Sequence, residues 1–269
     1  MKSNDLFDEI GYWSELKLDI IRKYATAYSN ILASRFHHIY IDAFAGAGMH
    51  ISRNTGDFVL GSPLNALFVK PPFKEIHLID LDGEKTQSLK ELTKDDLRVH
   101  IYSGDSNEIL FQEVFNHVKY EDYKRGLCLL DPYGLHLDWS VIEKAGKMKT
   151  IDMFLNFPVM DMNRNALWRN PEANPTGSER MTIFWGDESW KDTAYESEPT
   201  LFGDRKKKTT NEVIVAAFCE RLKQKAEFKY VAEPLPMKNS RGAIVYYLFF
   251  ASQQPVAQNI ISSIFNSYR

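Results

Sequence analysis

The chain has 269 residues, 44% of them hydrophobic, and its 33 basic and 36 acidic residues give a formal net charge of -3. This length is sufficient for one domain with a large core, and two cysteines exclude a disulfide framework or a cysteine-rich metal site. The near-neutral charge slightly disfavours a protein that grips a nucleic-acid backbone.

The sequence gives no sign of membrane insertion. The first residues lack the charged-then-apolar layout of a signal peptide, and the longest apolar run, 243–251, is far shorter than a membrane span. The two cysteines suit a reducing compartment. We therefore expect a cytoplasmic protein without membrane contact.

Helices and strands alternate along the first 160 residues. Apolar residues at helical spacing predict a leading helix at 13–34, and a strand is expected at 38–44. Residues 49–61 read as a long irregular insertion, after which Ser62 and Pro63 begin a delayed helix. The next predicted elements are a strand at 75–80, a helix at 83–93, a strand at 98–102, a helix at 106–118, a strand at 126–131, a helix at 140–145 and a strand at 152–157.

The last third of the chain departs from this alternation. Residues 161–210 are rich in Asn, Pro, Gly and Ser and are predicted to be an insertion on the substrate side of the sheet. A helix at 210–226, strands at 228–234 and 243–251, and a helix at 255–267 complete the chain. The two strands should form an antiparallel hairpin whose last strand inserts into the sheet. We expect one doubly wound α/β domain, 1–269, with a mostly parallel seven-stranded Rossmann-like sheet and an antiparallel last strand.

The stretch from His38 to Gly48 joins the first strand to a glycine-bearing turn. Gly46 and Gly48 can take backbone angles that are closed to other residues and let a ligand approach the chain. Asp42 lies at the junction, placed to hold an amino group directly or through water, and Phe44 lies in the turn. We take all four as candidate ligand-binding residues.

Three further apolar strands also end in carboxylates, at Asp80, Asp105 and Asp131. In an open α/β sheet, ligands bind at the carboxyl ends of the strands. Asp80 is placed to accept both hydroxyls of a ribose and Leu81 to face the base, while Asp105, with Ser106, suits the amine of an adenine. Asp80 and Asp105 can instead cap the following helices, which is the favoured role of Asp82.

These acceptors predict S-adenosylmethionine as the cofactor rather than NAD. The dinucleotide pattern G-x-G-x-x-G needs a third glycine at position 51, which is Ile51 here. It also requires a helix directly after the turn to receive a pyrophosphate, and the predicted helix begins only near Ser62.

The fourth strand runs into Asp131-Pro132-Tyr133-Gly134, which resembles the D-P-P-Y signature of methyltransferases that act on exocyclic amines of bases. We predict that Asp131 and the carbonyl fixed by Pro132 accept the N–H bonds of the acceptor amine and that Tyr133 stacks on its ring. An ordinary turn is the alternative, because each residue type favours one. Attack by a cysteine is set aside, since Cys128 lies inside the strand before the motif.

Other conspicuous residues receive structural interpretations. The tryptophans of the insertion, Trp168, Trp185 and Trp190, are expected in the core of a small subdomain, and 205–208 is expected to be a solvated basic loop. His37 and His38 read as surface residues, and no metal ligands are predicted.

The combination of a 13–28 helix carrying Lys17 with the motifs YIDAFAGAG, GSPLNAL, HLIDLD and LLDPYGLHLDW resembles the three-Cys-motif partner protein (TcmP) family over residues 12–160. That resemblance implies a class I S-adenosylmethionine-dependent methyltransferase-like fold in a bacterial or archaeal protein encoded beside a radical-enzyme-like protein with a three-cysteine motif. Two functions follow from the motifs and the resemblance. The chain is either a methyltransferase acting on a nitrogen of a nucleic-acid base or related amine, or a partner protein that keeps the binding fold without methyl transfer of its own.

Overall fold

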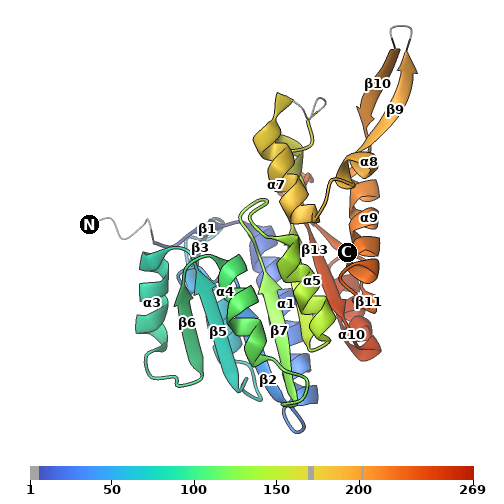
Figure 1. Cartoon of the computed structure of the whole chain (residues 1–269). Coiled ribbons are helices and arrows are strands. Elements are labelled where there is room, and N and C mark those ends of the chain that lie inside the picture. The colour runs from blue at the N-terminus through green and yellow to red at the C-terminus, as the bar shows by residue number, and fades with distance from the viewer. Residues whose placement is uncertain (1–5, 169–172, 201–202) are drawn as a thin grey trace.

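The computed structural model describes residues 6–168, 173–200 and 203–269. At its centre is an eight-stranded sheet with five neighbouring parallel strands, and helices lie on both sides of it (Figure 1). In spatial order the strands are β11 (Tyr230–Val231), β13 (Ile244–Ser252), β8 (Ile151–Phe157), β7 (Lys124–Leu130), β2 (His37–Asp42), β5 (Glu75–Asp80) and β6 (Val99–Ser103), while β12 (Leu235–Lys238) also pairs with β13.

The strand β13 runs antiparallel to β8 on one side and to β11 and β12 on the other. Its buried run of aromatic and aliphatic residues suits an interior strand. The sequence predicts one partner strand at 228–234, but the structure has two, and pairing continues beyond Pro236 to Lys238. Proline is tolerated in β12 because β12 pairs only with β13, so its outer side needs no N–H donor. The sheet therefore has eight strands instead of the expected seven.

Successive residues of a strand point to opposite faces of the sheet and pack into two separate hydrophobic layers. Ile39 and Ile41 pack into one layer, whereas Tyr40 between them packs into the other. The first layer is covered by α4 (Ser106–Gln112), the 3₁₀ helix η1 (Val114–His117), α5 (Trp139–Met148) and α9 (Asn211–Gln224). The second is covered by α1 (Tyr12–Leu32), α2 (Ser62–Leu67), α3 (Gly83–Thr93) and α10 (Pro255–Asn266).

The segment at 49–61 is ordered into strands, which corrects the irregular insertion expected from the sequence. β3 (Met49–Ser52) and β4 (Phe58–Leu60) form an antiparallel hairpin, and β1 (Glu9–Ile10) pairs in parallel with β3. The hairpin still delays α2, as predicted. Through the pairing of β1 with β3, it also holds the N-terminal segment near the edge of the sheet where β2 ends.

The insertion at 161–210 contains helices and a hairpin. After α6 (Val159–Asn165) come α7 (Pro175–Trp185), α8 (Trp190–Ala194) and the antiparallel strands β9 (Tyr195–Thr200) and β10 (Gly203–Lys208), which project from the body of the molecule (Figure 1). Trp185 and Trp190 are buried in the same layer as the sheet residues, whereas Trp168 is 44% exposed. The basic run at 205–208 lies in β10 and is not a loop.

Two further points concern the predictions of surface and membrane contact. His38 is fully buried and its Nε2 lies 2.8 Å from Ser29 Oγ, so the surface position expected for it is wrong. The hydroxyl of Ser29 satisfies one ring nitrogen, which makes burial tolerable. Among the described helices, none combines the length and apolar character needed to cross a membrane.

Candidate active site

Two cavities lie at the carboxyl ends of the parallel strands. The first, of about 450 Å³, is lined by Asp131 and residues of α1, α6 and β13, and we call it the Asp131 cavity. The second, of about 710 Å³, is lined by Asp105 and residues of α4 and α7, and we call it the Asp105 cavity. Residues that line both cavities are Phe44, Asp80, Lys85 and Tyr133. The two cavities therefore meet above the ends of β2, β5 and β7.

Asp80 holds the glycine turn at the junction of the cavities. Its Oδ2 accepts from the backbone N–H of Gly46 at 2.7 Å, and its Oδ1 accepts from the N–H of Asp82 at 2.9 Å. Gly46 has a φ of 63°, which a side chain would strain, and it lines the Asp131 cavity. Each oxygen of Asp80 retains a lone pair for a ligand. Asp80 and Gly46, which are both predicted to bind the cofactor, are thus brought together.

The Asp105 cavity gathers the other predicted base-side residues. Leu81 is 76% exposed there, while Ser106 is buried and donates its hydroxyl to the carbonyl of Ala43. Asp105 also caps α4, accepting from the N–H of Asn107 at 2.7 Å. Capping and ligand contact are therefore compatible, because one carboxylate oxygen remains open.

At the end of β5, Asp80 and Asp82 are each candidates for ligand contact or for helix capping, and the structure gives them different surroundings. Asp82 caps α3 by accepting from the N–H groups of Glu84 and Lys85. Capping is the role that the sequence favours for Asp82, whereas Asp80 faces both cavities.

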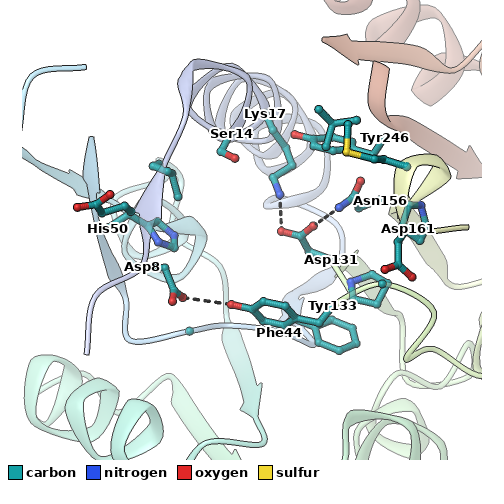
Figure 2. A pocket seen from close by; sticks show the side chains of 18 of the residues that line it. Asp8, Ser14, Lys17, Phe44, His50, Asp131, Tyr133, Asn156, Asp161 and Tyr246 are labelled. Carbon is teal, nitrogen blue, oxygen red and sulfur yellow. Dashed lines mark hydrogen bonds and ion pairs between the residues drawn. The ribbon is translucent and has the colours of Figure 1, made fainter. Parts of the chain in front are cut away.

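Asp131 lies at the centre of its cavity and is ion-paired with Lys17 of α1 (Figure 2). Its other oxygen accepts from Asn156 Nδ2 at 2.7 Å. Lys17 is 7% exposed and its Nζ lies 5.4 Å from the centre of the Tyr246 ring. Helix α1 and strand β8 therefore fix the carboxylate from two sides, and each oxygen of Asp131 keeps one lone pair for a ligand.

The rest of the motif is arranged around this carboxylate. Pro132 is buried in the wall, and Tyr133 is 68% exposed. Gly134 has a φ of 58°, and a Cβ there would lie 2.6 Å from Asp161 Oδ2. The motif ends in glycine because this turn needs a left-handed residue and because the Asp161 side chain occupies the adjoining space.

An N-terminal strap, residues 8–10, lines the Asp131 cavity, and its Asp8 contacts two residues that line both cavities. The hydroxyl of Tyr133 donates to Asp8 Oδ2 at 3.3 Å, and the same oxygen is 2.7 Å from Lys85 Nζ (Figure 2 shows the Tyr133 bond). Lys85 lies 5.9 Å from the centre of the Tyr133 ring. The strap holds the ring at the boundary between the two cavities, with one face toward a cation.

Two predicted residues are not placed as expected. Asp42 is fully buried and lines neither cavity, so it cannot contact a ligand directly; its Oδ1 accepts from the N–H of Phe44 at 3.3 Å. Gly48 has a φ of 89°, but its Cα faces Leu89 of α3, where a Cβ would lie 3.0 Å from that side chain. Gly48 therefore allows the turn to pack closely against α3. Asp42 stabilises the turn through its hydrogen bond with the Phe44 N–H.

The burial of Asp42 makes the stability of the protein depend on pH. Desolvation raises the pKa of Asp42 to about 7 from 3.8. Above pH 4 the unfolded chain is mostly without this proton, whereas the folded chain keeps it until the pH approaches 7, so the free energy of unfolding falls as the pH rises. We expect the free energy of unfolding of Asp42→Asn, relative to that of the wild type, to rise by about 3 kcal/mol between pH 4 and pH 7. Urea unfolding at both pH values measures this, with the exposed Asp95→Asn as control; parallel pH profiles for Asp42→Asn and the wild type would contradict it.

Several site residues are not evident from the sequence. Asn156 is the penultimate residue of an apolar strand, which is a weak signal, whereas Lys17 and His50 acquire their place only through tertiary packing. Within the described residues, Asn156 Oδ1 and His50 Nδ1 are buried without a hydrogen-bond partner, and both residues line the Asp131 cavity. Unpaired buried polar atoms are costly, so this cavity is prepared for a polar ligand.

The fold is similar to those of several solved structures. Protein LPL1258 from Legionella pneumophila strain Philadelphia 1 (family model DUF519) has a TM-score of 0.51 at 13% identity, over 93% of this chain and 92% of that protein. The N-methyltransferase NodS from Bradyrhizobium japonicum, in complex with S-adenosyl-l-homocysteine, has a TM-score of 0.44 at 10% identity, over 91% and 89%. A putative S-adenosylmethionine-dependent methyltransferase from Listeria monocytogenes has a TM-score of 0.43 at 14% identity, over 88% and 99%.

Two comparisons by sequence found no match. No model of a known protein family matches the chain, and no curated protein matches it. At 13% identity, the similarity to LPL1258 extends to the α/β fold alone.

Proposed function

We propose that this chain is an S-adenosylmethionine-dependent methyltransferase that acts on an amine nitrogen. The observation that carries the proposal is the meeting of the two cavities at Phe44, Asp80 and Tyr133. One cavity holds the predicted acceptors of a nucleoside, and the other holds the Asp131-Pro132-Tyr133 motif. A ligand that spans the junction places its reactive centre beside Asp131.

The residues of the Asp105 cavity fit the adenosine part of this cofactor. A ribose diol needs two adjacent acceptors, and each oxygen of Asp80 has a lone pair left after its backbone hydrogen bond. Leu81 offers exposed apolar surface to a base, and Asp105 can accept from an exocyclic amine. When bound, the cofactor supplies an activated methyl group.

The residues of the Asp131 cavity suit an amine acceptor. The open lone pairs of Asp131 can accept an N–H of the amine, while Lys17 and Asn156 keep the carboxylate in a fixed orientation. The exposed ring of Tyr133 can stack on a flat acceptor. These properties support a nucleic-acid base or a related aromatic amine as the substrate.

Two measurements test this function together. Calorimetry with S-adenosylhomocysteine tests the cofactor site, and transfer of a labelled methyl group from S-adenosylmethionine to RNA, DNA or free nucleosides tests the reaction. We expect saturable binding and label in at least one acceptor class. Absence of binding would contradict both the cofactor and the reaction.

A second candidate is a partner protein that binds the cofactor without transferring its methyl group. It is favoured by one observation, that both oxygens of Asp131 are already engaged by Lys17 and Asn156. The partner would be the three-Cys-motif protein implied by the family resemblance. Cofactor binding without methyl transfer, together with a stable complex between the two purified proteins, would support this candidate over the first. For either function we propose the cytoplasm, where the free thiols Cys128 and Cys219 remain reduced.

A further inference from the structure

Glu75, His77 and His100 lie together at the opposite end of the sheet from the active site. Glu75 and His77 are two residues apart on β5 and therefore point to the same face, and His100 is the register partner of His77 on β6. Their potential ligand atoms lie within 4.8 Å of one another. Figure 1 shows β5 and β6 side by side at the edge of the sheet. Five residues of strand, about 16 Å, separate Glu75 from Asp80.

The ring of His77 is held in a fixed orientation. It is buried, its Nδ1 lies 3.0 Å from the hydroxyl of Tyr102, and its Nε2 lies 3.2 Å from Glu75 Oε2. A histidine that is oriented by an outer partner at one nitrogen and faces a carboxylate with the other is typical of a metal ligand.

The other two residues complete an open site. His100 is exposed, and its ring is stacked on that of His77 with the centres 4.9 Å apart. Glu75 Oε1 lies 2.6 Å from His37 Nε2 and 3.3 Å from Lys124 Nζ, which leaves Oε2 facing His77. The outer groups therefore hold the carboxylate by one oxygen and leave the other for a cation.

We propose that Glu75, His77 and His100 form a zinc site that joins β5 to β6. Two imidazole nitrogens and one carboxylate are a ligand set that Zn²⁺ favours, whereas Mg²⁺ and Ca²⁺ require mainly oxygen ligands. Three protein ligands leave a fourth position for water or for a partner's side chain. Lys124 places a positive charge beside this site and thereby weakens it.

Zinc titration of the full chain, after treatment with a chelator and buffer exchange, tests this site by calorimetry. We expect one ion per chain and an affinity at least about tenfold weaker in His100→Ala, because one of three ligands is lost. His136→Ala is the matched control, since His136 is also an exposed histidine but lies in the Asp105 cavity. It should bind zinc at this site as the wild type does.

Two further variants test whether the ion binds at these residues. Glu75→Gln removes the negative ligand and should weaken binding as much as His100→Ala. Lys124→Met removes the opposing charge and should tighten binding severalfold. No saturable binding by the wild type, unchanged affinity in His100→Ala and Glu75→Gln, or no gain in Lys124→Met would each overturn the proposal. The test measures zinc binding in the absence of the cofactor, so its outcome does not depend on the proposed function.

Discussion

Asp131→Asn is expected to lower the rate of methyl transfer by at least about a hundredfold, with the affinity for S-adenosylhomocysteine within about twofold of the wild type. The loss is concentrated in the rate because the carboxylate contacts the acceptor amine as its nitrogen attacks, and proton-accepting and orienting groups of this kind contribute about 10²–10⁴-fold. Steady-state kinetics with the best acceptor, alongside calorimetry, measures the two effects separately.

Asparagine is the informative replacement at this position. Asp131→Ala would leave the buried ammonium of Lys17 unpaired, at a cost of about 3–5 kcal/mol in stability. A loss of activity in that variant could then not be distinguished from unfolding. Asp131→Asn keeps an acceptor oxygen for Lys17. Its amide can also donate to Asn156 Oδ1, which is buried without a partner among the described residues, if the Asn156 amide turns over. Methyl transfer at the wild-type rate in Asp131→Asn would remove Asp131 from the reaction.

Tyr133 provides a graded companion test of the same contact. Tyr133→Phe keeps the ring and loses only the hydrogen bond to Asp8, so a mild loss of activity is expected. Tyr133→Ala removes the surface on which the acceptor stacks, and a severe loss is expected, with about 1–3 kcal/mol of acceptor binding removed per stacked base. Equal activities of the two variants would show that the ring does not contact the acceptor.

Asp80→Ala is expected to weaken the binding of S-adenosylhomocysteine by at least about tenfold. A charge-assisted hydrogen bond to a ribose hydroxyl contributes about 1.5–3 kcal/mol. The same substitution frees the N–H groups of Gly46 and Asp82, which then lose the partner that shapes the turn. Calorimetry measures the affinity and thermal unfolding measures the cost to the fold.

Two controls separate these contributions. Asp80→Asn keeps an acceptor for one backbone N–H and removes the charge, so its affinity should fall between those of Asp80→Ala and the wild type. Asp95→Ala removes an exposed carboxylate after α3 and should leave the affinity unchanged. An Asp80→Ala protein that binds like the wild type would place the ribose away from β5.

The sequence predicts the central part of the fold because local patterns determine it. The buried strands are marked by short apolar runs, and their carboxyl ends are marked by Asp80, Asp105 and Asp131, which the parallel sheet necessarily brings to one edge. The glycine turn is also local, since Gly46 needs a positive φ whatever surrounds it. These features were therefore accessible without knowledge of tertiary contacts.

The remaining features depend on packing between distant segments. Lys17 is 114 residues from Asp131 in the chain, and only the docking of α1 on the sheet brings them together. The strap at Asp8 and the pairing of β1 with β3 have no local signal either. Asp42 is the opposite case, because Asp80 at the end of β5 lines both cavities, whereas Asp42 at the end of β2 is fully buried. A carboxylate at a strand end is thus a candidate, and burial decides its role.

The most direct test of the central claim is a crystal structure of the chain with S-adenosylhomocysteine. The account predicts that the ribose hydroxyls hydrogen-bond to Asp80, that the adenine lies in the Asp105 cavity beside Leu81, and that the sulfur faces Asp131 and Tyr133 across the junction of the cavities. A complex in which the ligand lies outside these two cavities, or in which its sulfur points away from Asp131, would contradict it.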